Sequence, residues 1–139
     1  MGSGKDASAA HLVSAHGFTR FAFADQLKEL ARAIGWDGEK DDVGRKLLQN
    51  LGHNAREILG PDVWVEAMDQ AIARAELDPK ENRIVVTDVR YPNEVEWVKD
   101  RGGILVKIIR PSLDLSGLEH RHPTETNVDT FKVDRVVVN

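Results

Sequence analysis

Extended and helical patterns alternate along the second half of the chain, and this alternation constrains the fold more than any other feature. The runs "RIVVTDVR" (83–90), "ILVKIIR" (104–110) and "VDRVVVN" (133–139) are rich in β-branched residues, as buried strands are. A helical pattern that ends in glycines, "PNEVEWVKDRGG", separates the first two runs. Strands that alternate with helices favour a mainly parallel sheet with helices on both faces.

The first half of the chain is mostly helical in pattern. The periodicity predicts a helix over 7–17, a short strand over 18–23, and helices over 24–35, 43–60 and 61–77. Gly17 suits a helix C-terminus, Asp25 is placed to cap the second helix, and Pro61 suits the first turn of the last one.

Length and composition exclude several classes of protein. With 139 residues, 41% of them hydrophobic, and a net charge of −4, the chain is sized for one soluble globular domain. No membrane-spanning run or secretory leader is present, so we expect a cytoplasmic protein with no membrane partner. The absence of cysteine excludes disulfides, cysteine-based zinc sites and thiol catalysis. The acidic balance argues against a nucleic-acid polymer as partner.

Polar residues at the predicted strand ends are candidate ligand contacts, because parallel sheets bind ligands beyond the carboxyl ends of their strands. Asp25, Asp88, Arg90 and Arg110 hold such positions. Asp88 is placed like the carboxylate that holds Mg²⁺ in P-loop enzymes, and Arg90 points the same way if the strand continues. A plain ion pair between Asp88 and Arg90 is the alternative.

The opening residues, "MGSGKD", look like the end of a phosphate-binding loop, which reads G-x-x-x-x-G-K-[ST] after a buried strand. Gly2, Ser3, Gly4 and Lys5 are present, whereas Asp6 replaces the usual Ser or Thr. Backbone N–H groups before a helix and the Lys5 ammonium would bind the phosphates of a nucleoside triphosphate. The same letters also fit a flexible end left by a start codon or an expression tag.

The long helix over 43–60 has two distinct sides. Its apolar side, the predicted core face, comprises Val43, Leu47, Leu51, Ala55 and Ile58. A second stripe comprises Arg45, Gln49, Gly52 and Arg56. The stripe contains no acidic residue to pair its arginines. A glycine inside a helix costs about 1 kcal/mol of stability relative to alanine, so its presence suggests that a neighbouring group needs the space. Two guanidiniums and an amide beside a gap suit a phosphate and a base edge, and a solvated face is the alternative.

Together these segments resemble a known family. The strings "SGKD", "FTRFAFADQLKE", "GRKLLQNLG", "DVWVEAM", "VVTDVRYPNEVEWV", "VKIIRP", "HPTET" and "DRVVVN" occur in the order seen in phage-type deoxynucleoside monophosphate kinases. That family has the adenylate-kinase-like P-loop fold, and its "SGKD" loop is similar to that of animal phosphomevalonate kinase. The resemblance covers nearly the whole chain, and "FADQLKE" followed by "TDVRYPNE" is its most specific part.

The resemblance implies an α/β, P-loop NTPase-like three-layer sandwich and a set of site residues. The ATP-phosphate loop would comprise Gly2, Ser3, Gly4, Lys5 and Asp6. The magnesium ligands would be Asp6 and Asp88, and the catalytic cations Lys5, Arg90 and Arg110. The dNMP would contact Asp25, Lys28, Arg45, Gln49, Arg56, Trp64 and Asn93. Arg110 also begins the lid region, where "HPTET" matches the family's H-x-S-E pattern loosely because Thr124 replaces serine.

The ends of the chain depart from the family. Members begin with an apolar strand and a longer glycine loop, and they continue past the position of Asn139 with a glycine turn and a helix. We therefore expect one domain over 1–139 that lacks the central first strand, with exposed strand edges and a poorly anchored loop. Either the first residue would be internal to a longer protein, or the chain would be a degenerate fragment. The chain as written would bind ATP weakly and turn over slowly or not at all.

The predicted function is transfer of the terminal phosphoryl group of ATP-Mg²⁺ to a dNMP, giving ADP and dNDP. The partners would be ATP as co-substrate and a dNMP. The protein would act in the host cytoplasm if a phage encodes it, and a homodimer is possible. Two alternatives stay open: a kinase of another small phosphorylated acceptor, as in phosphomevalonate kinase, and a non-catalytic nucleotide-binding remnant.

Overall fold

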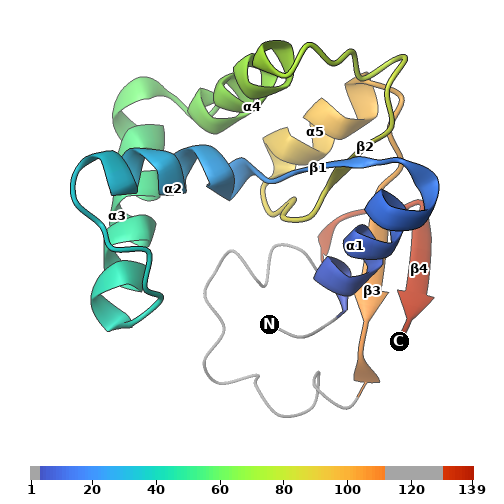
Figure 1. The fold of residues 1–139 in the computed structure, drawn as a ribbon, viewed down its shortest axis with the longest axis horizontal. Coiled ribbons are helices and arrows are strands. Elements are labelled where there is room, and N and C mark those ends of the chain that lie inside the picture. The colour runs from blue at the N-terminus through green and yellow to red at the C-terminus, as the bar shows by residue number, and fades with distance from the viewer. Residues whose placement is uncertain (1–3, 112–129) are drawn as a thin grey trace. The chain divides into compact units, whose positions relative to one another are not determined.

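The protein folds as an α/β chain of helices and short strands (Figure 1). The computed structural model describes residues 4–111 and 130–139. The elements, in chain order, are α1 (Lys5–His16), β1 (Thr19–Phe21), α2 (Phe23–Ala33), α3 (Asp42–Leu59), α4 (Val63–Arg74), β2 (Ile84–Val86), α5 (Pro92–Asp100), β3 (Val106–Ile109) and β4 (Arg135–Val138). The predicted order of helices and strands is therefore confirmed, although the strands are shorter than their sequence patterns.

The strands form two separate pairs, β1–β2 and β3–β4. The pair β3–β4 is parallel, as predicted, with Val106 opposite Arg135 and Ile109 opposite Val138. Asp134 sets the start of this pairing, because its carboxylate accepts the backbone N–H of Leu105 at 2.7 Å and its own N–H donates to the Leu105 carbonyl at 2.9 Å. The single continuous sheet of a three-layer sandwich is not present in the described parts of the chain, where each sheet has two strands.

The chain divides into two compact units. One unit comprises Met1–Arg20 with Pro79–Asn139, and the other comprises Phe21–Asp78. The first unit contains α1, β2, α5, β3 and β4, and the second contains α2, α3 and α4.

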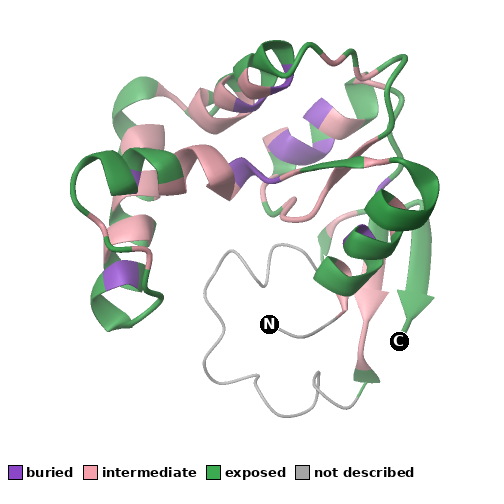
Figure 2. Ribbon diagram, viewed as in Figure 1, coloured by how far each residue is buried: buried purple, intermediate pink, exposed green. Residues whose placement is uncertain are grey.

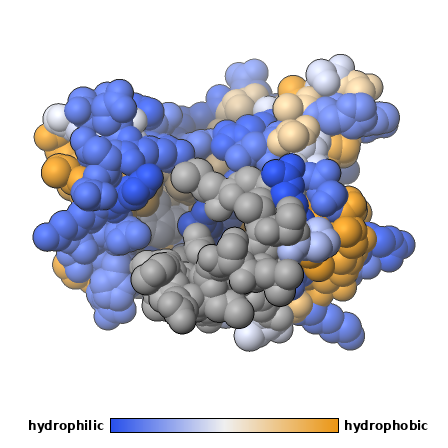
Figure 3. All heavy atoms as spheres, turned by 90° about the horizontal axis from the view of Figure 1, so that it is seen from below, coloured by the Kyte–Doolittle hydropathy of each residue, from blue (hydrophilic) through white to orange (hydrophobic). Residues whose placement is uncertain are grey.

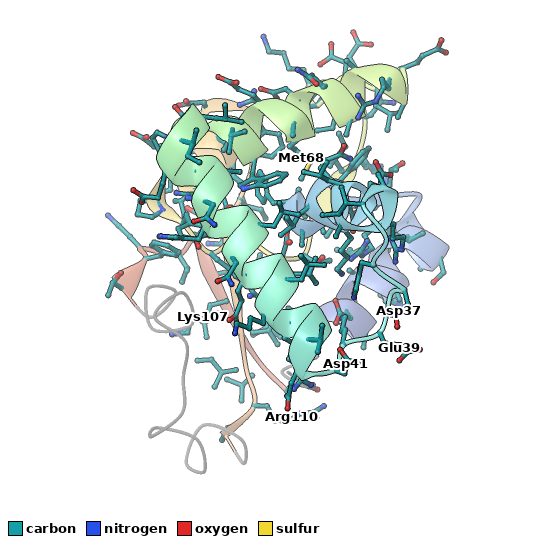
Figure 4. All side chains as sticks on the ribbon, turned by 90° about the vertical axis from the view of Figure 1, so that its left-hand side faces the viewer. Asp37, Glu39, Asp41, Met68, Lys107 and Arg110 are labelled. Atoms are coloured by element: carbon teal, nitrogen blue, oxygen red, sulfur yellow. The ribbon has the colours of Figure 1, made fainter. Side chains whose placement is uncertain are left out.

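The helical unit is built around α2, which packs against both α3 and α4. Ala31 of α2 is fully buried and Met68 of α4 is 1% exposed. Both helices carry buried segments, drawn purple in Figure 2, and Met68 lies between α4 and α2 in Figure 4. The 18 residues of α3 extend for about 27 Å, whereas the 11 residues of α2 cover about 16 Å, so the ends of α3 project beyond its partner. Val43 and Ile58 at these ends are 76% and 80% exposed, so the predicted core face of this helix is wrong at both ends.

Two predicted helix starts are also wrong. Helix α2 begins at Phe23, whose side chain is buried, so the N-cap position falls on Ala22 and Asp25 lies inside the first turn. Helix α4 begins at Val63 with Asp62 at the N-cap position, so Pro61 precedes the helix. Burial of an apolar side chain at the start of α2 outweighs the local capping preference of an aspartate.

The loop before α3 is closed by local hydrogen bonds. The Asp41 carboxylate caps the helix by accepting the Gly44 N–H at 2.8 Å, and the Trp36 indole donates to the Glu39 carbonyl at 3.0 Å. Asp37, Glu39 and Asp41 come from this loop and lie near the N-terminal end of α3 in Figure 4. A loop bonded in this way holds the start of α3 in one conformation.

The other unit has a small core and one exposed strand pair. Ala9, Val95, Trp97 and Leu105 are buried there. Strand β4 is exposed along its whole length, and apolar surface covers the region of the β3–β4 pair in Figure 3. Within the described ranges, no helix combines the length and the apolar character needed to cross a membrane.

Candidate functional site

The N-terminus of α1 has the geometry of an anion site. Gly4 occupies the N-cap position with φ of 98°, a left-handed conformation that favours glycine, and no side chain caps the helix. The first N–H groups of a helix have no partner inside the helix, and the helix dipole favours negative charge there. Gly4 and its flanking N–H groups therefore suit a phosphate, as the sequence predicts. Gly2 and Ser3, which complete the predicted loop, lie outside the described residues.

Both ends of α1 lie beside residues that flank strands. At its C-terminal end, the Arg83 guanidinium, just before β2, donates to the His16 carbonyl at 2.9 Å. At its N-terminal end, a Cβ atom on Gly4 would overlap the side-chain amide of Asn139. Asn139 follows β4 and donates its backbone N–H to the Ile109 carbonyl at 2.8 Å. The N-terminus of α1 thus lies at the carboxyl ends of β3 and β4, where parallel strands bind ligands.

The predicted cation and carboxylate of the phosphate loop, Lys5 and Asp6, are neighbours on α1. The Lys5 ammonium lies 3.1 Å and 3.3 Å from the two carboxylate oxygens of Asp6. The Lys5 side chain is 38% exposed and the Asp6 side chain 74%, so this pair is solvated and contributes little to stability. A bound phosphate can therefore replace Asp6 as the partner of Lys5 at small cost. Arg110 directly follows β3 and is half-buried, at the same end of the pair as Gly4.

The loop after β2 presents Asp88 half-buried and Arg90 exposed. Arg90 is bonded through its backbone N–H, and its side chain makes no ion pair with Asp88 in the structure. The binding role of Asp88 and Arg90 therefore stays a prediction. Asn93, the next predicted contact, is half-buried in the first turn of α5.

Two carboxylates, Asp6 and Asp88, are the predicted magnesium ligands. Among residues 4–111 and 130–139, no three or more His, Asp or Glu side chains are grouped closely enough to hold a metal by themselves. Mg²⁺ in kinases is held by one or two carboxylates together with substrate phosphates and water, so two oxygen donors of this kind suit it. The assignment of both residues to a metal stays a prediction.

The other predicted acceptor contacts lie in the helical unit. Asp25 and Lys28 of α2 are half-buried, Arg45 and Gln49 of α3 are exposed, and Arg56 of α3 is half-buried. The site residues predicted from sequence are thus divided between the two compact units, with the phosphate loop, Asp88, Arg90, Asn93 and Arg110 in one and these five together with Trp64 in the other.

Two observations correct the interpretation of the polar stripe on α3. Arg45 has an acidic partner one turn away, since its guanidinium lies 4.0 Å from the Asp42 carboxylate. Gly52 does not leave a gap for a ligand, because a Cβ atom there would lie 3.2 Å from a methyl group of Leu27. The glycine lets the Leu27 side chain of α2 approach α3 closely. Periodicity could not reveal this, because Leu27 belongs to a different helix.

Trp64, another predicted acceptor contact, has a structural partner. Its indole N–H donates to the Gly52 carbonyl at 3.1 Å and ties α4 to α3. The side chain is half-buried, so its ring and not its N–H is what remains for a ligand.

Sequence reasoning missed two residues beside the predicted site, Glu94 and Asn139. Glu94 is 3% exposed and accepts the backbone N–H groups of Arg90 and Tyr91. Its position, three residues after the N-cap of α5, is the acidic position of a capping box and was a usable signal. Asn139 had no such signal, because its proximity to Gly4 depends on the packing of α1 against the ends of β3 and β4.

Several viral proteins are similar to the chain, among them the following three. A protein of Acanthamoeba polyphaga mimivirus, provisionally named a deoxynucleotide monophosphate kinase, is 28% identical over 164 aligned positions that span 99% of this chain and 83% of that protein. The deoxynucleoside-5′-monophosphate kinase of Escherichia phage T5 is 29% identical over 101 positions, 68% of this chain and 38% of the phage protein. The uncharacterized protein ORF76 of Ictalurid herpesvirus 1 is 28% identical over 141 positions, 100% of this chain and 57% of the viral protein.

Neither protein-family models nor solved structures add to this similarity. No protein-family model matches the sequence, and no solved structure matches it. The chain therefore has distant homologues that are named as kinases of deoxynucleotide monophosphates. It spans 38% of the length of the phage T5 protein and 57% of the length of the herpesvirus protein.

Proposed function

We propose that the protein is a deoxynucleoside monophosphate kinase, which transfers the terminal phosphoryl group of ATP to a dNMP and gives ADP and a dNDP. The observation that carries the proposal is the left-handed Gly4 at the start of α1, beside Lys5 and at the carboxyl ends of β3 and β4. This arrangement supports a phosphate site of the kind that nucleotide enzymes use. The names of the homologues support the choice of substrate.

The donor nucleotide binds through its phosphates. Backbone N–H groups at the start of α1 donate to phosphate oxygens, and the Lys5 ammonium exchanges Asp6 for the terminal phosphates. Asp6 and Asp88 would hold Mg²⁺, which when bound neutralises phosphate charge. These donors fit a magnesium-nucleotide, because each contributes carboxylate oxygens and Asp88 follows a strand at its end.

The transfer itself needs positioning and positive charge more than covalent help. An oxygen of the acceptor phosphate forms a bond to the terminal phosphorus of ATP, the bond from that phosphorus to the bridging oxygen breaks, and its electron pair leaves with ADP. Lys5, Arg90 and Arg110 stabilise the negative charge on the moving group. The exposed Arg90 side chain is free to reach this group, since the described residues offer it no competing ion pair.

The acceptor nucleotide is assigned to the remaining predicted residues. Arg45 and Arg56 would bind its phosphate, and Gln49 a base edge. Asp25, Lys28, Trp64 and Asn93 would complete the acceptor site. Among residues 4–111 and 130–139, the Arg45 guanidinium has a solvated contact with Asp42 at 4.0 Å, which a phosphate dianion can displace.

The direct test is ADP release from ATP-Mg²⁺ with each of the common dNMPs as acceptor. We expect release that depends on one or more dNMPs, with the matching dNDP as second product. Lys5→Ala should abolish it, while Lys99→Ala, which removes an exposed lysine from α5, should not. Binding of ATP without transfer to any dNMP would contradict the proposal. Transfer to a different phosphorylated acceptor would place the protein among other small-molecule kinases.

A further inference from the structure

Glu94 is a buried carboxylate that the proposed transfer does not use. It is 3% exposed, and among residues 4–111 and 130–139 it is the one charged residue that is buried. Burial of a carboxylate is costly unless hydrogen bonds replace the lost water. The partners that stabilise Glu94 therefore indicate what the residue does.

One oxygen of Glu94, Oε2, accepts two successive backbone N–H groups. The distance is 2.7 Å to the N atom of Arg90 and 3.1 Å to the N atom of Tyr91. The bond to Tyr91 is explained by helix capping, because Tyr91 is the N-cap residue of α5 and the Glu94 N–H donates back to the Tyr91 carbonyl at 3.1 Å. Helix capping does not explain the bond to Arg90. It is the shorter of the two, lies in the range of charge-assisted hydrogen bonds, and reaches a residue outside the helix.

The Arg90 bond fixes the backbone of the loop that carries the catalytic candidates. Strand β2 ends at Val86 and α5 begins at Pro92, so Asp88 and Arg90 lie in a short connection anchored by β2 at one end and by Glu94 at the other. The Arg90 side chain is exposed while its backbone N–H is held against a buried carboxylate. A guanidinium on a fixed backbone loses less conformational freedom when it binds a phosphoryl group than one on a mobile loop.

We infer that Glu94 is a positioning residue for phosphoryl transfer, which holds the backbone at Arg90 so that its guanidinium is presented to the reacting group. Glu94 does not touch the substrate; it acts through Arg90. The inference rests on the proposed function, and its test separates the two.

The first measurement is amide hydrogen exchange in the protein without nucleotide. Glu94→Gln removes the charge but keeps an acceptor oxygen, and it should accelerate exchange at the Arg90 and Tyr91 amides about tenfold, as expected when charge-assisted bonds become neutral ones. Glu96→Gln is the matched control, because it makes the same change at an exposed position of the same helix. It should leave both amides unchanged. Glu94→Asp, which keeps the charge but withdraws it by one methylene, provides the same comparison if the amide variant does not fold.

The second measurement is a double-mutant cycle with Arg90→Ala, read as kcat and as KM for ATP and for the dNMP. Glu94→Gln should lower kcat about tenfold or more and change KM for ATP little, because the hold on Arg90 matters most when charge develops on the moving group. In the Arg90→Ala background the same substitution should have little further effect, because a residue that acts through Arg90 has nothing left to position. A residue needed only for folding would lower activity equally in both backgrounds.

The outcomes are distinguishable. An active wild-type enzyme in which Glu94→Gln behaves like Glu96→Gln, or in which its effect persists without Arg90, would overturn the positioning role and leave the proposed function standing. A wild-type protein that transfers phosphate to no dNMP would overturn the proposed function and with it the positioning role of Glu94 in phosphoryl transfer. Amide exchange, which needs no substrate, would still show whether the carboxylate holds the loop.

Discussion

Substitution of Gly4 by alanine tests whether the start of α1 is a nucleotide phosphate site. At φ of 98° an alanine is strained by about 1–2 kcal/mol. For a chain of 139 residues this strain lowers the melting temperature by roughly 3–8 °C. The new Cβ would also overlap the Asn139 amide, but that amide is the end of a side chain and can rotate away. The loss of stability should therefore come mostly from the backbone.

Binding of ATP should fall by more than the loss of stability explains. Relief of the strain moves the backbone N–H groups at the start of α1, and each charge-assisted bond to phosphate that is lost costs about 1.5–3 kcal/mol. We therefore expect Gly4→Ala to weaken ATP binding by roughly ten- to a hundredfold, measured by calorimetry on the folded variant.

Gly17→Ala is the matched control. Gly17 closes the other end of α1 with φ of 69°, and nothing lies within 4 Å of the position its Cβ would take. The control should lose a similar amount of melting temperature and keep its affinity for ATP. Equal ATP affinity in the two variants would refute the phosphate site, because both would then report only the strain of a left-handed alanine.

Three further outcomes follow from the same structure. Arg56→Ala should raise KM for the dNMP by roughly tenfold or more and KM for ATP little, since a charge-assisted phosphate contact is lost; equal effects on both substrates would remove Arg56 from the acceptor site. Asp88→Asn should keep the fold and lower kcat much more than nucleotide affinity, and unchanged turnover at limiting Mg²⁺ would contradict its metal role. Met68→Ala should lower the free energy of unfolding by about 2–5 kcal/mol, because its side chain is 1% exposed. Leu59→Ala, at a position that is 73% exposed, should change it by less than about 0.5 kcal/mol, and similar losses for both would show that Met68 is not a core residue.

The order of the elements could be predicted from the sequence because each pattern is local. Gly17 ends α1 in the left-handed conformation, as predicted, since that preference belongs to the glycine itself. The runs at 104–110 and 133–139 contain the parallel strands β3 and β4, because β-branched residues favour extended backbone. The faces of α3 were predicted less well. Periodicity shows which residues share a side of a helix, but not how far the neighbouring helices extend along it.

Some residues of the candidate site could also be identified from the sequence, whereas others could not. The glycine, lysine and aspartate at the start of α1, and the polar residues after β2 and β3, could be identified because a strand or helix end leaves its neighbours available for ligands. Their roles, and those of the acceptor residues on α2, α3 and α4, stay predictions. The interpretation of Gly52 failed because a missing side chain looks the same in sequence whether a ligand or Leu27 takes the space.

The sequence by itself determined the α/β character of this protein, the order of its helices and strands, and the candidate residues for phosphate binding, because each depends on the conformational preferences and charges of neighbouring residues. Only the tertiary structure decided that the strands form two pairs, that Asn139 lies against Gly4, and that Glu94 holds Arg90 from inside the protein. The two pairs and the Gly4 contact join segments far apart in the chain, so they depend on packing and not on local preference. Glu94 is close in sequence to Arg90, but its burial, which makes the bond strong, comes from the core that forms around α5.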